Sequence, residues 1–446
     1  MGFVSLFLFL IGLVSFLTKK KHITLITILI LASSYFRLVP GYFLLGSLSL
    51  QHGDLALLLI FILIPINFKG VNSELKGIEK GLLLFLVFLA ISIIYDFSFR
   101  GTSLLQIFRT TRKIGYLMFF FLLGSFNWRD YKKLFVFLVL VTLLHATFYI
   151  SQYIFGYSYT PSLDILKVTM VNELGSARYT NGPTYIIPIL VICIFTFFRT
   201  NIKMYLVVLL VVSVILGQSR GAIISVFSIL ILYLYLQNKI KMATLILLPI
   251  LSFIVYTLLL IYFPVINERF IHLFNEINLI GDMDYNNLNS FYHEGSFIFR
   301  FGVTYERFIY VLEDPIRILL GVGYVPDIDI THPIFTIGTI SPMLPTGFEQ
   351  YNSVDIFFPN IITRYGLVGS IIYLYLIITI IVFSYKNKVL LWGKILFTYL
   401  CSLIFISLIN ETFYNGIYFI IIFIFLGMIL NEKKIMRIAR IKSLVI

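Results

Sequence analysis

The chain has 446 residues, of which 59% are hydrophobic, 17% are aromatic and only 12% are charged. A soluble domain cannot bury this much apolar surface, so we expect a membrane protein. The net charge of +13 does not indicate a nucleic-acid-binding protein, because the basic residues lie in short clusters between apolar runs, as topological signals do.

Apolar runs predict an all-α polytopic membrane protein with about 12–14 transmembrane helices. The first run, from Gly2 to Thr18, is followed by Lys19, Lys20 and Lys21, whereas a signal peptide carries its charge before the run. A retained helix is therefore predicted. Cys193 and Cys401 lie within predicted spans and indicate neither a disulfide framework nor a metal site. The predicted spans are 3–18, 23–38, 54–68, 81–95, 114–127, 134–156, 184–198, 204–219, 221–237, 243–263, 366–384, 389–409 and 416–430.

Lysines mark one side of the predicted membrane domain. Of the 19 lysines, 16 lie in alternate connecting segments, which the positive-inside rule assigns to the cytoplasm. This count places the N-terminus outside. The lysine-rich segments are 19–22, 69–80, 128–133, 199–203, 237–242, 385–388 and the basic tail 431–446.

Arginines gather on the opposite side, where 11 of the 15 lie. The planar guanidinium pairs bidentately with phosphate or carboxylate, which lysine does not imitate. Many of the acidic residues lie in the same outer segments, so ordinary ion pairing is the alternative explanation for any one arginine. The outer arginines are Arg37, Arg100, Arg109, Arg112, Arg178, Arg220, Arg269, Arg300, Arg307, Arg317 and Arg364.

The exoplasmic loop 264–353 is the one connecting segment with room for soluble structure. Its sequence predicts an amphipathic helix from about 297 to 313 along the membrane surface, ended by Asp314 and Pro315. Arg300 and Arg307 are seven residues apart and share a face of this helix. Gly321 and Gly323 predict a turn after it.

Arg220 lies in "LGQSRGAIISVF" (216–227), a short polar interruption between two apolar spans. One explanation is a snorkelling side chain or a helix-end cap. The other is an anion site at the outer membrane surface, where low dielectric strengthens each contact and a lipid-linked phosphate or diphosphate is the natural ligand.

Four segments, in order, resemble the O-antigen ligase/polymerase superfamily. "GQSRGAIISVFSILILYLYL" resembles its Ser-Arg-Gly helix entry, and "ARYTNGPTYIIPILVICI" resembles the segment in which Arg and Gly-Pro precede a span. "FRFGVTYERFIYVLEDPIRILLGVGY" is similar to its loop helix, and "SVDIFFPNIITRYGLVGSIIYLYL" to its return helix with Gly-x-x-Gly. The resemblance covers about 170 to 385.

The resemblance implies a metal-independent glycosyltransferase with a GT-C-like fold and no cofactor, in the bacterial cytoplasmic (inner) membrane. Its active site would be exoplasmic, and its substrates would be undecaprenyl-diphosphate-linked oligosaccharides. Residues 1–170 would be N-terminal membrane helices, 171–430 the polymerase/ligase-like domain and 431–446 the cytoplasmic tail. Carried over by residue, Arg220 and Arg300 match the arginines thought to bind diphosphate, and Arg178 is a third.

Asp355 marks a departure from the ligases, which have a histidine eleven residues before the first glycine of Gly-x-x-Gly. Here that glycine is Gly366 and position 355 is Asp. Asp355 resembles the catalytic aspartate of the shape, elongation, division and sporulation polymerases. We therefore expect Asp355 to act as the base, with Arg220 and Arg300 as a diphosphate clamp, although an N-cap role is the alternative. Arg178, Arg307 and Arg364 are the predicted substrate-binding residues.

Three functions compete at this stage. A polymerase would join oligosaccharide repeat units into O-antigen or capsule, with membrane lipid, a flippase and a chain-length regulator as partners and no nucleic acid. A ligase would transfer the glycan to another acceptor, and Asp in place of His counts against it. A flippase or transporter would carry charges near the bilayer midplane and broken helices in repeated halves, and neither pattern is present in the sequence.

Overall fold

The computed structural model confirms an all-α membrane architecture. It describes residues 2–37, 42–45, 48–67, 70, 72–156, 170–171, 177–178, 182–196, 200–217, 220–237, 296–325, 338–340, 348–350, 357–407, 413 and 416–445, with side chains over slightly narrower ranges.

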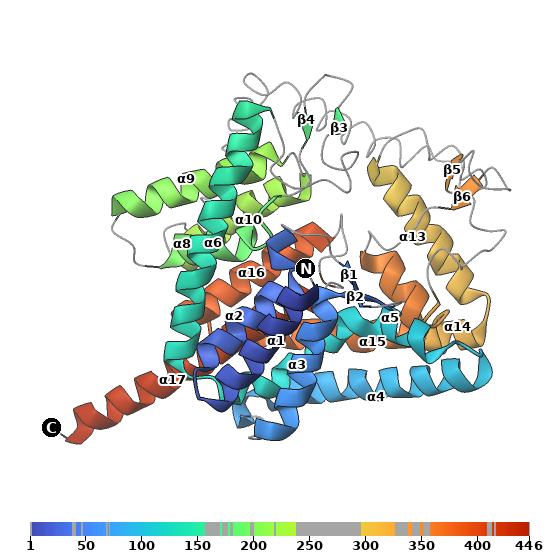
Figure 1. Cartoon of the computed structure of the whole chain (residues 1–446), viewed down its shortest axis with the longest axis horizontal. Helices are drawn as coiled ribbons and strands as arrows, with labels where there is room; N and C mark the ends of the chain where they lie inside the picture. Colours follow the sequence, from blue (N-terminus) through green and yellow to red (C-terminus); the bar gives the residue numbers. More distant parts are fainter. Residues whose placement is uncertain are drawn as a thin grey trace.

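The N-terminal part is a set of helices that pack on one another (Figure 1). Its helical elements are α1 (Gly2–Leu17), α2 (Lys21–Ala32), η1 (Tyr35–Arg37), α3 (His52–Asn67), η2 (Ser73–Leu75), α4 (Lys76–Phe99), α5 (Leu104–Gly115), η3 (Tyr116–Ser125) and α6 (Trp128–Phe155).

The C-terminal part contains a second group of helices, and three short antiparallel strand pairs lie between helices (Figure 1). Its helices are α8 (Ile186–Phe195), α9 (Thr200–Leu216), α10 (Arg220–Leu236), α13 (Ser296–Leu312), α14 (Pro315–Leu320), α15 (Phe357–Lys386), α16 (Leu391–Ser407) and α17 (Gly416–Val445). The strands are β1 (Tyr42–Leu45), β2 (Leu48–Gln51), β3 (Met170–Val171), β4 (Ala177–Arg178), β5 (Gly338–Ile340) and β6 (Phe348–Gln350), paired in that order.

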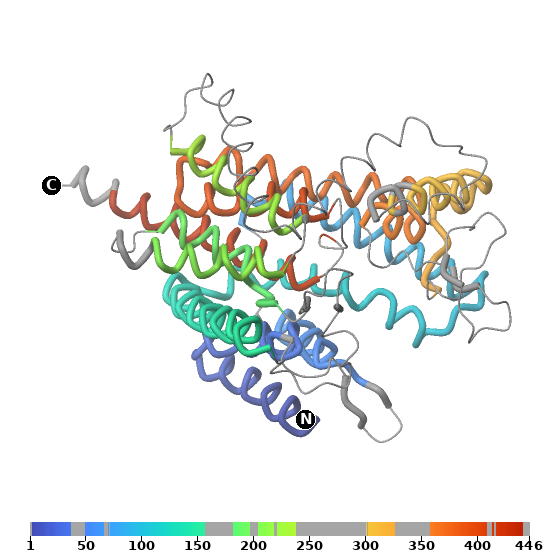
Figure 2. Tube along the Cα trace, turned by 90° about the horizontal axis from the view of Figure 1, so that it is seen from above, coloured from blue at the N-terminus to red at the C-terminus, as the bar shows by residue number. Residues whose placement is uncertain are grey.

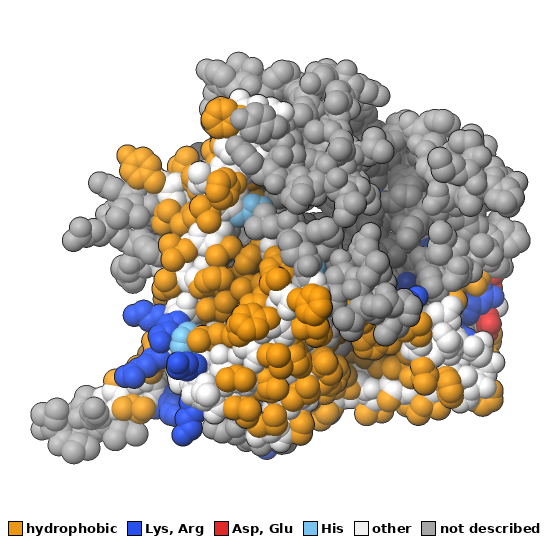
Figure 3. All heavy atoms as spheres, in the orientation of Figure 1, with side chains coloured by type: hydrophobic (Ala, Val, Ile, Leu, Met, Phe, Trp, Pro, Cys, Tyr) orange, Lys and Arg blue, Asp and Glu red, His pale blue; other side chains and the backbone are white. Residues whose placement is uncertain are grey.

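Four helices within the described residues are long and apolar enough to cross a bilayer. They span Ser73–Phe99, Trp128–Phe155, Phe357–Lys386 and Gly416–Ala439, and several shorter apolar helices accompany them. Large apolar side chains such as Phe3, Phe7 and Val14 of α1 are exposed. Figure 3 shows hydrophobic side chains over much of the described surface on this face. Such a surface fits contact with lipid.

The core of the described part lies around α8 and the first half of α17, which are apolar on all sides. In α8 every residue from Ile187 to Phe195 is buried, and in α17 the same holds from Phe419 to Ile429. A helix that is apolar all round is stable only when neighbours surround it. Helix α17 packs against α16 and η3, and then extends beyond the bundle toward the C-terminus (Figures 1 and 2).

Several predicted spans coincide with helices, including 3–18 with α1, 54–68 with α3 and 134–156 with α6. The predicted span 243–263 lies outside the described residues. Residues 114–127 differ from the prediction, because most of them form the 3-10 helix η3 instead of an α-helix. A 3-10 helix rises about 2.0 Å per residue, so it spans a given thickness of the membrane with fewer residues than an α-helix does.

Candidate functional site

The candidate site lies where four segments of the predicted outer side meet. The C-terminal end of α4 and the middle of α5 contact the turn that follows α14, and this turn packs against the first half of α15. Helix α13 also packs against α15 (Figure 1). Segments that the sequence assigns to one side of the membrane therefore come together in space.

The break between α13 and α14 has a local cause. Asp314 is the N-cap of α14, and its Oδ1 accepts a hydrogen bond of 2.8 Å from the Ile316 N–H. Pro315 occupies the first helical position, where a missing N–H costs nothing. The hydrogen bond from the Ile316 N–H lowers the pKa of the Asp314 carboxyl. The cap therefore stays charged at a lower pH than an ordinary aspartate does. The helix end predicted at Asp314 and Pro315 is confirmed.

Replacement of Asp314 by alanine is expected to destabilise the protein by about 1 kcal/mol, because the N-terminal N–H groups of α14 lose their acceptor. Asp314→Asn is the matched control, since asparagine caps helices as well as aspartate does. Thermal unfolding in detergent would measure the difference. Equal melting temperatures for the two variants would contradict a capping role.

The Gly-x-Gly turn and the first glycine of Gly-x-x-Gly are adjacent in space. Gly366 interrupts α15 with φ 63° and ψ −170°, and a Cβ there would collide with the carbonyl oxygens of Arg317 and Ile318. The backbone N–H of Val322 donates to the Thr363 oxygen at 2.7 Å. Gly321 and Gly366 are therefore required, because the backbone of the turn after α14 and that of α15 approach one another too closely for a Cβ at either position.

Asp96 at the end of α4 fixes the same turn. Its side chain is fully buried, and its Oδ2 accepts the Tyr324 N–H at 2.6 Å. Its Oδ1 accepts from Arg100 Nη1 at 2.8 Å, and Arg100 Nη2 donates to the Gly321 oxygen at 2.7 Å. Gly323 has φ 90°, and a Cβ there would collide with the Asp96 carboxylate. The turn is thus held by an ion pair that is mostly removed from water.

Three predicted arginines have described side chains, and all lie on the paired helices α13 and α15. Arg364 is 5% exposed, with Nε donating to Asn360 Oδ1 at 3.1 Å and Nη1 donating to the Val325 oxygen at 2.9 Å. Arg307 is 3% exposed, next to the buried Glu306, and Arg300 is half-buried. Neither Arg300 nor Arg307 is fully exposed to solvent, and their roles in the proposed site stay predictions.

The other predicted site residues are less fully described. Arg220 begins α10 and Arg178 ends β4, but both side chains lie outside the described residues. Asp355 also lies outside them, two residues before the start of α15. Their proposed roles stay predictions.

Two polar residues of this region were missed by the sequence reasoning, namely Asp96 and Asn360. Asp96 and Arg100 stand four residues apart at a helix end, a spacing that predicts an ion pair on one face. Their contact with the turn 228 positions later carries no local signal. Within the described residues, no group of three or more His, Cys, Asp or Glu side chains could hold a metal ion.

A comparison with known families matches part of this region. Residues 205–374 match the family described as O-antigen ligase, from within α9 to the middle of α15. No curated protein matches the chain. The matched segment includes Arg220, Arg300, Arg307, Asp355 and Arg364, but not Arg178. The match over residues 205–374 supports the resemblance of this chain to the O-antigen polymerase/ligase superfamily.

Proposed function

We propose that the protein is a polymerase that joins polyprenyl-diphosphate-linked oligosaccharide repeat units into O-antigen or capsular polysaccharide. The observation that carries the proposal is the family match over 205–374, which contains two buried arginines on the packed helices α13 and α15. Buried guanidinium groups at a membrane surface suit the recognition of a diphosphate. The location is the outer face of the cytoplasmic membrane.

The proposed reaction is a direct displacement. Asp355 removes the proton from an acceptor sugar hydroxyl, and the oxygen attacks the anomeric carbon of the donor. The bond from that carbon to the diphosphate oxygen breaks, and the polyprenyl diphosphate leaves with the electron pair. Attack opposite the leaving group inverts the donor carbon. The chemistry of the leaving group requires positive charge, which Arg220 and Arg300 supply.

Arg364, Arg307 and Arg178 are proposed to hold the second lipid diphosphate. The orientation of the Arg364 guanidinium is fixed by hydrogen bonds to Asn360 and to the Val325 carbonyl. A side chain fixed in this way loses little entropy when it binds an anion. Helix α15 would thus contribute Arg364 shortly after the proposed base.

Replacement of Arg220 by lysine is expected to lower polymer synthesis at least about a hundredfold, because lysine keeps the charge but loses bidentate contact with the diphosphate. The measurement is the length distribution made by purified protein in liposomes from undecaprenyl-diphosphate-linked repeat units. Arg109→Lys is the control, since Arg109 is an exposed arginine of the same predicted side. A full ladder from the Arg220 variant would rule out bidentate recognition.

A ligase is the second candidate, and the description of the matched family favours it. The two functions differ in the acceptor, which is a second lipid-linked repeat unit for a polymerase and a different glycan carrier for a ligase. The same liposomes separate them. Lengthening of the lipid-linked substrate with no other acceptor present supports polymerisation, and its absence until another acceptor is added supports ligation.

A further inference from the structure

A cavity in the described part of the chain lies away from the candidate site, on the side that the lysines assign to the cytoplasm. Its volume is about 980 Å³. The turn between α1 and α2, the segment before η2, the end of η3 and the distal half of α17 line it. Three segments of the lysine-rich set thus converge on one cavity, whose volume lies within the usual range of ligand pockets.

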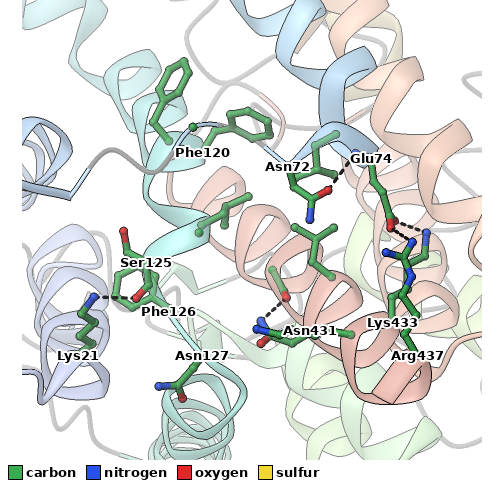
Figure 4. Close-up of a pocket in the computed structure, with 18 of the residues that line it drawn as sticks. Lys21, Asn72, Glu74, Phe120, Ser125, Phe126, Asn127, Asn431, Lys433 and Arg437 are labelled. Carbon is green, nitrogen blue, oxygen red and sulfur yellow. Dashed lines mark hydrogen bonds and ion pairs between the residues drawn. The ribbon is translucent and has the colours of Figure 1, made fainter. Parts of the chain in front are cut away.

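The charge of this cavity is strongly unbalanced. Among the lining residues that the structure describes, five are bases and Glu74 is the one acid. Lys433 Nζ lies 2.6 Å from Glu74 Oε2 and Arg437 Nη2 lies 2.7 Å from Glu74 Oε1, so both use the same carboxylate (Figure 4). The bases are Lys19, Lys21, Lys433, Lys434 and Arg437.

The basic groups approach the cavity from opposite sides. Figure 4 shows Lys21 beside Ser125, whose backbone oxygen accepts from Nζ at 2.9 Å, across the hollow from Lys433 and Arg437. Neither Lys19 nor Lys434 forms an ion pair with any residue that the structure describes. Gathering like charges around a hollow is unfavourable unless an anion enters it.

We propose that this cavity binds a phosphate group, and that its source is an anionic phospholipid of the inner leaflet. Lysine ammonium groups bind phosphate as point charges, and the amides of Asn72 and Asn431 add polar groups to the lining. Phe120 and Phe121 provide an apolar wall beside the charges, as a lipid requires. Basic pockets between membrane helices on the cytoplasmic side suit lipid headgroups. The inference does not depend on glycan transfer.

Native mass spectrometry of the full chain in detergent, with equal amounts of phosphatidylglycerol and phosphatidylcholine, tests the proposal. We expect the wild type to retain phosphatidylglycerol, and Lys19→Gln/Lys434→Gln to weaken this preference about tenfold. The control is Lys132→Gln/Lys133→Gln, which removes two exposed lysines of the same side that do not line the cavity. Equal losses in the two variants, or no preference in the wild type, would overturn the phospholipid as the ligand of this cavity.

Glu74→Gln distinguishes binding from folding. Loss of this carboxylate removes the acid that Lys433 and Arg437 share, so phosphatidylglycerol should be retained more strongly, whereas a misfolded variant would retain less. A second arm measures thermal stability with inorganic phosphate and with pyrophosphate. Another outcome is that the ions raise the melting temperature of the wild type but not of Lys19→Gln/Lys434→Gln, while the wild type shows no preference for phosphatidylglycerol. That combination would support a phosphate site but exclude a phospholipid as its ligand.

Discussion

Replacement of Asp96 by alanine is expected to lower the free energy of unfolding by about 3 kcal/mol, the lower end of the range for removing one partner of a buried ion pair. Asp96 is fully buried, whereas the Arg100 side chain is 22% exposed, and partial access to water reduces the cost. The variant leaves the Tyr324 N–H without its acceptor and Arg100 without its carboxylate. Denaturant or thermal unfolding in detergent measures the loss.

Asp96→Asn is the matched control for this prediction. Asparagine keeps the size of the side chain and an oxygen that can accept the Tyr324 N–H, but it removes the charge that pairs with Arg100. Its stability should therefore lie between that of the wild type and that of Asp96→Ala. If both variants unfold at the temperature of the wild type, the ion pair does not stabilise the fold.

The same variant links stability to the proposed reaction. Asp96 binds the backbone of Tyr324, and the carbonyl of the next residue, Val325, accepts from Arg364. Release of the turn would remove one of the hydrogen bonds that fix the Arg364 guanidinium. Asp96 is therefore a positioning residue in this proposal, and Asp96→Ala should raise KM for the lipid-linked acceptor below the unfolding temperature.

The helices and the local features of the candidate site were accessible from the sequence. Apolar runs of sufficient length predicted α1, α6 and α16, because a spanning helix satisfies its own backbone in lipid. The break at Asp314 was predictable because proline and an N-cap residue act within one helical turn. The turn at Gly321 was predictable for the same reason, since it depends on local backbone freedom.

The contacts that assemble the site were not accessible in this way. The sequence indicated that Gly366 mattered, but not that α15 starts nine residues before it and bends there to admit the backbone of α14. The role of Asp96 was not predictable, because its contact with Tyr324 joins residues that are far apart in the sequence. The 3-10 geometry of η3 is likewise set by tertiary packing, because hydropathy does not distinguish it from an α-helix.

Asp355→Asn is expected to lower polymer synthesis by about 10²–10⁴-fold, the usual contribution of a general base, and to leave single repeat units on the lipid. Asparagine is as good an N-cap as aspartate, and α15 begins two residues later, so the change removes the base but preserves a cap. The same liposome assay measures the product length, and the melting temperature should not change.

Asp355→Ala completes the comparison, because alanine can serve neither as a base nor as a cap. If Asp355 is the base, Asp355→Asn and Asp355→Ala are both inactive. If it only caps α15, the asparagine variant makes long chains while the alanine variant is less stable by about 1 kcal/mol. Long chains from Asp355→Asn would therefore remove the proposed base while leaving the family match over 205–374 intact. The proposed displacement would then need a different proton acceptor, because the acceptor sugar hydroxyl still loses a proton.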